Sequence, residues 1–300
     1  INARALYESN AKAAVFEAAI NTPIIDDVLM ARIAGSYNTS QGWLHNVNNG
    51  QDAPDQINYA GRLKLLFRPN DNFDATFKIE GSSNTNKSGL AMQIYNCSNP
   101  MPAPYANPTA SSSCGLALSR GYPIGITGDD YIAGDGQLLK LTSGESVLNM
   151  NYRFGGGYTL TSVTGYFYYD FNIKLDTDAM PEKLLNVNQP ETYKQYSQEF
   201  RISSPTARNI SWTAGIYYQH GDLNVENAQS FFNQTNLVNT DAAYTPFRAY
   251  TPIGFDIIYD QEEETYSAFG ALTWNLNEKA QLDFGLRYSK TRKNYVYDSF

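Results

Sequence analysis

The sequence predicts an all-β fold, an antiparallel up-and-down transmembrane β-barrel to which this chain contributes about ten to eleven strands. Three observations indicate it. Short polar turns alternate along the chain with long irregular connections, and the segments between them alternate apolar with polar residues. Aromatic residues are abundant, with 23 Tyr, 15 Phe and 3 Trp in 300 residues. Outer-membrane barrels combine short periplasmic turns, longer extracellular loops and aromatic girdles at both interfaces.

The predicted connections alternate in length along the chain. Short ones are expected at residues 22–27, 69–72, 155–157, 205–209 and 275–280. Long ones are expected at about residues 40–57, 83–143, 176–192 and 222–261. Because neighbouring strands of a meander run in opposite directions, this alternation places the short turns at one end of the sheet and the long loops at the other.

The strand segments have two different faces. In residues 62–68 the apolar Leu63, Leu65 and Phe67 alternate with the charged Arg62 and Lys64, and segments 73–80, 147–154 and 281–289 follow the same rule. Side chains of a membrane barrel alternate between lipid and lumen. We expect the following residues to face lipid: Leu63, Leu65, Phe67, Phe73, Phe77, Ile79, Leu148, Met150, Leu282, Phe284 and Leu286. We expect the following to face the lumen: Arg62, Lys64, Arg68, Asp74, Lys78, Glu80, Arg153, Glu199, Arg201, Asp283 and Arg287.

Alternation alone also fits a soluble antiparallel sheet with one dry face. Two features favour the membrane. Segments 158–175 and 210–225 are longer than soluble strands of about 5–6 residues and suit strands that cross about 9–11 residues of bilayer and continue beyond it. Many aromatic residues fall near strand ends, where interfacial girdles form: Tyr37, Trp43, Tyr59, residues 166–169, Tyr193, Tyr196, Tyr217, Tyr218 and Trp274.

Composition narrows the classes further. No run approaches 18 consecutive apolar residues, which excludes a spanning helix. The formal charge of −8 argues against a nucleic-acid partner, which would require a basic face. The first ten residues lack the order of a secretory signal peptide, so we expect a processed chain or one that begins inside a larger product.

No catalytic or cofactor motif is recognisable, and no enzyme activity, cofactor or metal site is expected. The two histidines, His45 and His220, lie in or beside different predicted loops and lack the spacing of zinc ligands. Phosphate-loop, nucleophile-elbow and HExxH motifs are missing. Asp176 and Asp178 share a DxD spacing without the rest of an EF-hand loop, and whether they bind a cation stays open.

Both cysteines, Cys97 and Cys114, lie in the longest predicted loop. The segment between them is rich in Pro, Asn and Ser and cannot fold by burying apolar surface. An even cysteine count in an oxidising compartment favours a disulfide, which across such a loop contributes about 3 kcal/mol.

Five blocks resemble barrel strands of the TonB-dependent receptors of the bacterial outer membrane. They are FEAAINTPIIDDVLMARIAGSYNTSQGWLHN, YAGRLKLLFRPNDNFDATFKIEG, YKQYSQEFRISSP, ISWTAGIYYQH and YSAFGALTWNLNEKAQLDFGLRYSK. The resemblance implies a large barrel with a plugged lumen, embedded in outer-membrane lipid. It also implies energised uptake of a ferric siderophore, cobalamin or oligosaccharide, driven by the TonB complex through an N-terminal plug.

The chain departs from the whole family pattern. It has no recognisable plug, and its strands number about half of those in such a barrel. The last segment, residues 281–300, runs from a short turn toward the extracellular side. We therefore expect residues 1–300 to be one partial β-barrel domain, the first half of the barrel, with the plug and the C-terminal strands absent.

The resemblance suggests roles for two groups of residues. The charged lumen-facing residues would contact the plug or line the ligand route, or merely solvate a wet interior. Ligand contacts are expected from aromatic residues of the extracellular loops: Tyr95, Tyr105, Tyr122, Phe231, Phe232, Tyr244 and Tyr250. Two alternatives stay open, a passive porin-type channel and a soluble surface adhesin or carbohydrate-binding β-sandwich.

Overall fold

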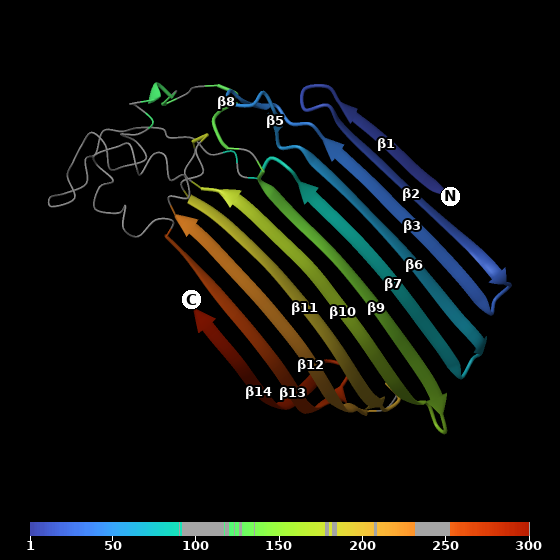
Figure 1. Cartoon of the computed structure of the whole chain (residues 1–300). Helices are drawn as coiled ribbons and strands as arrows, with labels where there is room; N and C mark the ends of the chain where they lie inside the picture. The colour runs from blue at the N-terminus through green and yellow to red at the C-terminus, as the bar shows by residue number, and fades with distance from the viewer. Residues whose placement is uncertain are drawn as a thin grey trace.

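The structure is a computed structural model of the whole chain. It describes residues 1–89, 91, 117, 120–122, 124–125, 128–134, 136–177, 180–181, 185–206, 209–231 and 253–299. These residues form one curved antiparallel sheet of eleven strands and a second sheet of three short strands (Figure 1). No helix in the described ranges is long and apolar enough to cross a membrane.

The strands of the large sheet are hydrogen-bonded in the order in which they occur in the chain. They are β1 (Asn2–Glu8), β2 (Ala13–Ile25), β3 (Leu29–Ser40), β6 (Gln56–Asn70), β7 (Phe73–Asn86), β9 (Leu138–Phe154), β10 (Tyr158–Asp176), β11 (Leu185–Ser203), β12 (Ile210–Phe231), β13 (Ile253–Asn277) and β14 (Ala280–Ser299). Every neighbouring pair is antiparallel. The predicted all-β, up-and-down topology is confirmed.

All five predicted short turns lie at one end of the sheet (Figure 1). The turn between β9 and β10 contains Gly156 and Gly157 with φ of 76° and 86°, values that an L residue with a side chain rarely adopts. The longer connections lie at the opposite end, which we call the loop end. Strand β14 runs from its short turn toward the loop end, as predicted.

Three of the predicted long loops are shorter in the structure; in the 83–143 prediction, residues 83–86 and 138–143 belong to β7 and β9. Strand β11 already begins at Leu185, and strands β12 and β13 extend to Phe231 and from Ile253, so much of residues 185–192 and 222–261 is paired strand. Asn224 and Asp260, for example, are register partners in this extension. Beyond a bilayer both faces of a strand meet water, so apolar alternation stops although the ladder of backbone hydrogen bonds continues. The sequence pattern alone therefore hides the ends of long strands.

The small sheet at the loop end was not predicted. It contains β4 (Leu44–Asn46), β5 (Asp52–Ala53) and β8 (Asp130–Tyr131), with β4 and β8 parallel. Tyr131 is buried in it, and this burial raises the pKa of its hydroxyl. The Asn46 side chain donates to the carbonyl oxygen of Ala133 at 3.1 Å. Residues 41–55 and 128–134 are thus joined by hydrogen bonds between residues that are more than 80 positions apart in the sequence.

The large sheet has one apolar and one polar face. Leu63 pairs with Ile79 and Leu65 with Phe77, while Arg62 pairs with Glu80. Followed from strand to strand, the register places all eleven residues predicted to face lipid on one face and all eleven predicted to face the lumen on the other.

The apolar face carries no second layer in the described part of the chain. Ile33, Ile216 and Leu286 are 60%, 59% and 81% exposed on it. A soluble sandwich would cover such residues with another sheet. The described residues therefore form no two-layer sandwich, and their apolar face is open.

Candidate functional site

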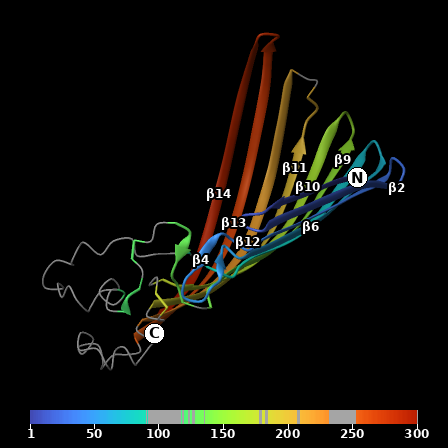
Figure 2. The same cartoon turned by 90° about the horizontal axis from the view of Figure 1, so that it is seen from above.

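The sheet is curved (Figure 2), and side chains of its polar face approach one another across strands, so this face is the concave one. Asp74, Thr161 and Ser267 on it are less than 10% exposed although no other layer packs over them in the described residues. The guanidinium carbon of Arg287 on β14 lies 5.6 Å from the ring centre of Tyr217 on β12, two strands away. Side chains on this face converge, so it encloses space where polar groups from many strands can act together.

Oppositely charged residues cluster on the concave face of β6, β7 and β9. Glu80 forms ion pairs with Arg62 and with Lys78, the latter at 3.3 Å, and Lys78 also forms an ion pair with Glu145. Arg62, Glu80 and Glu145 line a hollow of about 580 Å³, together with Arg4, Glu17 and Arg32. We call Arg62, Lys78, Glu80 and Glu145, together with Arg4, Glu17 and Arg32, the charged cluster. Sequence analysis identified Arg62, Lys78 and Glu80 but missed Glu145, which comes from a strand predicted to begin later.

A polar network occupies the turn end of the same face. Asp74 accepts from the Asn151 amide at 2.8 Å and pairs with Arg153 at 2.6 Å. Asn151 in turn accepts from the Thr161 hydroxyl at 2.8 Å. The network joins β7, β9 and β10 and brings together two residues predicted to face the lumen.

The remaining predicted residues are less connected. Arg201 and Glu199 are 3.6 Å apart on one strand. Asp283 accepts from the Thr273 hydroxyl at 2.7 Å near the turn end. Lys64 and Arg68 share the concave face by register. The structure thus groups some of the predicted residues and spreads the rest along the face.

Tyrosine and glutamine side chains line the concave face of β11, β12 and β13 toward the loop end. The hydroxyl groups of Tyr193, Tyr217 and Tyr259 each donate to the side-chain oxygen of the glutamine two residues later, at 2.9, 2.7 and 2.7 Å. Residues two apart on a strand share a face, so each pair uses the glutamine carbonyl and leaves its NH₂ group for other partners. We call these three tyrosines and the glutamines after them the tyrosine ladder.

The tyrosine ladder corrects part of the predicted aromatic girdle. Tyr169, Tyr193 and Tyr217 are predicted to belong to the aromatic girdle, but their side chains lie on the concave face. The rings of Tyr169 and Tyr193 are 5.6 Å apart there. Tyr169 also donates a hydrogen bond to Glu191. Runs of adjacent tyrosines such as Tyr168–Tyr169 place one ring on each face, which a count of aromatic residues near strand ends does not resolve.

Arg287 is the best-packed of the predicted lumen residues on β14. Its guanidinium carbon lies 5.5 Å from the Phe269 ring centre and 5.6 Å from that of Tyr217, and it donates to the Ser267 hydroxyl at 3.0 Å. Gly215 makes this possible, because a Cβ there would lie 2.5 Å from the Phe269 ring. The arginine, although exposed, lies within cation–π distance of two aromatic rings.

Most predicted loop contacts lie outside the described residues. These are Tyr95, Tyr105, Phe232, Tyr244 and Tyr250, and with them Cys97, Cys114 and Asp178. Tyr122 is described and half-buried, and Phe231 ends β12. Asp176 is buried and accepts from the backbone N–H of Gly134 at 2.9 Å, which joins the end of β10 to the small sheet.

The convex face is layered along the strands. On β12 it carries Ile210, Trp212 and Ile216, then Tyr218, whose ring lies 4.9 Å from that of Tyr266 on β13. Tyr218 and Tyr266 belong to an aromatic row on the loop-end side of the apolar band, which we call the upper aromatic row. Toward β3 this row continues with Tyr196, Tyr59 and the Phe16–Tyr37 pair. A lower row contains Tyr152, Phe154, Tyr158 and Trp212. Two aromatic rows that flank an apolar band are typical of outer-membrane barrels.

No known family model matches the sequence. Solved structures of outer-membrane receptors, however, match nearly the whole chain. The ferric yersiniabactin uptake receptor FyuA from Yersinia pestis superposes with a TM-score of 0.69 at 15% identity, over 96% of this chain and 38% of the receptor. The fold is that of part of a TonB-dependent receptor barrel.

Two further structures agree. The ferripyoverdine receptor of the outer membrane of Pseudomonas aeruginosa gives a TM-score of 0.60 at 11% identity, over 96% of this chain and 37% of that one. The ferric citrate transporter FecA gives 0.59 at 8% identity over the same shares. The chain therefore spans less than two fifths of each of these three receptors, and the resemblance seen in the sequence is confirmed at the level of the fold.

Proposed function

We propose that this chain is part of the barrel of an outer-membrane receptor that imports a scarce extracellular ligand with energy from the TonB complex. The observation that carries the proposal is a single eleven-stranded meander with a banded apolar convex face and a charged concave face. This meander superposes on an uptake receptor over 96% of the chain. The ligand belongs to the class of ferric siderophores, cobalamin or oligosaccharides.

The convex face supports the outer-membrane location. Its apolar band lies between two aromatic rows, and large apolar side chains such as Ile216 and Phe284 are 59% and 58% exposed. A soluble monomer rarely exposes a continuous apolar surface of this extent. Lipid is the partner that such a surface requires.

The concave face supports a ligand route from the loop end. The tyrosine ladder offers aromatic rings and glutamine NH₂ donors, and Lys293 pairs with Glu263 beside it at 2.8 Å. Aromatic faces with a few convergent polar groups are typical of small-molecule sites. These side chains are the candidates for contact with a ligand that has passed the extracellular loops.

The charged cluster is the candidate surface for a plug supplied by the rest of the receptor. Its carboxylates and cations already pair with one another, so a plug could exchange these pairs for its own hydrogen bonds. Exposed ion pairs contribute only about 0–1 kcal/mol each. A plug that moves during transport can therefore leave and rejoin such a surface at little cost.

The test is energised uptake by cells that express the complete receptor. Uptake of radiolabelled ferric siderophores, cobalamin and oligosaccharides is measured with and without a functional TonB complex. We expect one ligand class to accumulate only when TonB is active. Accumulation that is equal in both strains would contradict the proposal and support the passive channel.

A further inference from the structure

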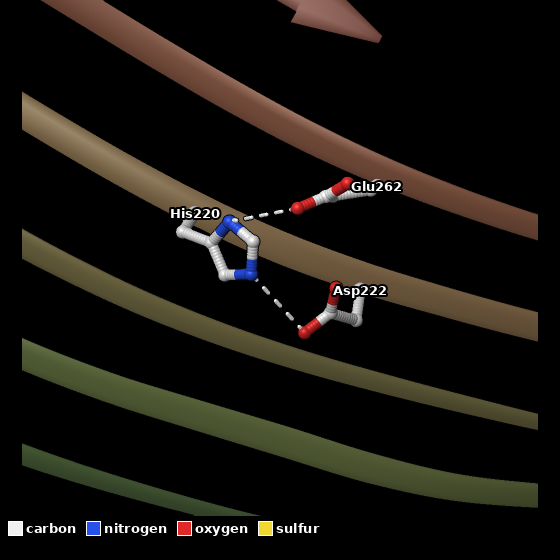
Figure 3. Close-up of side chains that lie close together, drawn as sticks. All are labelled: His220, Asp222 and Glu262. Atoms are coloured by element: carbon white, nitrogen blue, oxygen red, sulfur yellow. Dashed lines mark ion pairs between the residues drawn. The ribbon is translucent and has the colours of Figure 1, made fainter. Parts of the chain in front are cut away.

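We propose that His220, Asp222 and Glu262 form a binding site for a divalent transition-metal ion of the Zn²⁺ type on the convex face of β12 and β13. Figure 3 shows how the three side chains lie. His220 and Asp222 lie two residues apart on β12, and Glu262 is the register partner of Asp222 on β13. The inference does not depend on the transported ligand.

The three side chains already point toward one another. A ring nitrogen of His220 lies 3.3 Å from Asp222 Oδ2, and the other lies 4.0 Å from Glu262 Oε1. One ligand atom from each residue fits within 4.8 Å of the others. Ligands of a tetrahedral ion at about 2.0–2.2 Å are roughly 3.4 Å apart. All three side chains are at least 32% exposed. The two carboxylates lie at different nitrogens of the imidazole ring, so the side chains must rotate until one ring nitrogen and both carboxylates meet the same ion.

The arrangement of charges favours a cation. Asp222 and Glu262 are directly opposite each other on neighbouring strands, where like charges are unfavourable. In the described residues the one ion-pair partner within 4.0 Å of either carboxylate is His220. Lys194 is the register partner of Asp222 on β11, but no ion pair joins them in the described structure. A bound divalent ion would neutralise both carboxylates.

Neighbouring acidic residues have other partners. Glu263, on the concave face of β13, pairs with Lys293 at 2.8 Å. Glu264 accepts from the Tyr266 hydroxyl at 3.5 Å. Glu264 is the register partner of His220 on the same face, but in the described residues the ligand atoms that come within 4.8 Å of one another are those of His220, Asp222 and Glu262.

The height of the cluster on the barrel keeps it in water. His220 follows Tyr218, the upper aromatic row of β12, by two residues. At about 3.4 Å per residue, His220 and Asp222 lie roughly 7 and 14 Å beyond Tyr218 along β12, while His220 is in register with Tyr196 on β11. An ion there would join β12 to β13 in the middle of their paired length, which continues from the cluster to the Phe231–Ile253 pair.

The ligand set indicates the kind of ion. One imidazole and two carboxylates suit Zn²⁺ and related ions better than Ca²⁺ or Mg²⁺, which prefer oxygen ligands alone. Three protein ligands leave a fourth position for water or for another oxygen donor. Each ligand must be deprotonated, so occupancy falls as pH is lowered.

The chain contains a matched control. His45 also pairs with an aspartate, Asp52, at 3.1 Å, but the third group near Asp52 is the Lys12 ammonium, at 3.9 Å. A histidine–aspartate pair beside a lysine cannot hold a cation in the same way. Loss of His45 should therefore leave metal binding unchanged.

The experiment uses the complete receptor, purified in detergent and stripped of metal with EDTA. ZnCl₂ is titrated calorimetrically into the wild type and into the variants His220→Gln, Glu262→Gln and His45→Gln. We expect His220→Gln to lose one equivalent of bound Zn²⁺, Glu262→Gln to bind it at least tenfold more weakly, and His45→Gln to match the wild type. Heat-modified mobility on gels confirms that each variant is folded.

X-ray absorption on the zinc-loaded wild type provides the second measurement. It should give nitrogen and oxygen ligands at about 2.0–2.2 Å. The proposal is overturned if His220→Gln binds Zn²⁺ with unchanged stoichiometry and affinity. It is also overturned if CaCl₂ displaces Zn²⁺ at equal concentration, because the imidazole would then not be a ligand.

Discussion

Replacement of Leu63 by arginine tests whether the convex face lies in lipid. Leu63 is on β6, four residues from Tyr59 in the upper aromatic row and four from Phe67 near the turn end. At about 3.4 Å per residue, the segments from Leu63 to Tyr59 and from Leu63 to Phe67 are each about 14 Å along the strand. For a strand tilt near 40°, each segment spans roughly 10 Å across the bilayer. The two halves give a band of about 21 Å, close to the usual height of about 25 Å. Leu63 therefore lies near the midplane.

An arginine at the midplane of a barrel's lipid face costs about 2–4 kcal/mol of folding free energy. The matched control is Leu66→Arg, three residues away on the same strand but on the concave face, where Leu66 pairs with Thr76. An arginine there reaches a wet interior that already holds Arg62 and Lys64. We expect a loss below about 1 kcal/mol, the usual range for surface substitutions.

The assay is reversible unfolding of the complete receptor in lipid vesicles by guanidinium chloride, followed by tryptophan fluorescence. The difference between the midpoints of the two variants, multiplied by a common slope, gives the difference in free energy of unfolding. Equal losses for Leu63→Arg and Leu66→Arg, or a larger loss for Leu66→Arg, would refute the assignment of the convex face to lipid.

Four further predictions concern other parts of the chain. Asp74→Ala should lower the free energy of unfolding by about 1–3 kcal/mol, because its amide and guanidinium partners lose a buried acceptor. Arg287→Met should lower it by about 0.5–1 kcal/mol through the lost ring contacts, and Arg292→Met on the convex face of the same strand should have no measurable effect. Cys97 and Cys114 should resist maleimide labelling until a reductant is added, and labelling without reductant would exclude a disulfide. The isolated 300 residues should aggregate in detergent, because β1 and β14 each leave one edge unpaired in the described sheet; a monodisperse monomer that conducts ions would contradict this.

Much of the fold was predictable because it depends on a two-residue period. Segments 62–68 and 281–289 each show which side chains share a face, and the register confirms both assignments. Turn residues such as Gly156 and Gly157 mark the short connections from local conformation alone. The strand order then follows, since a meander pairs each strand with the next.

The features that sequence analysis missed depend on pairing between strands. Asp222 and Glu262 are 40 positions apart, and only the β12–β13 register brings Glu262 to His220 and Asp222. The tyrosine ladder repeats a Tyr-x-Gln spacing on three strands, but the spacing becomes meaningful only when the strands align. A search for Tyr-x-Gln in successive predicted strands could have found it.

The two faces of the sheet therefore carry different kinds of information. Lipid imposes the same demand on every strand, so the convex face repeats one pattern, and a resemblance at 15% identity or less is enough to preserve the fold. Under the proposed function the concave face would meet a particular ligand and a particular plug, and its residues pair in ways that differ from strand to strand. Variation in the tyrosine ladder and the charged cluster should consequently change which ligand is imported while leaving insertion intact. Variation in the convex band should do the reverse.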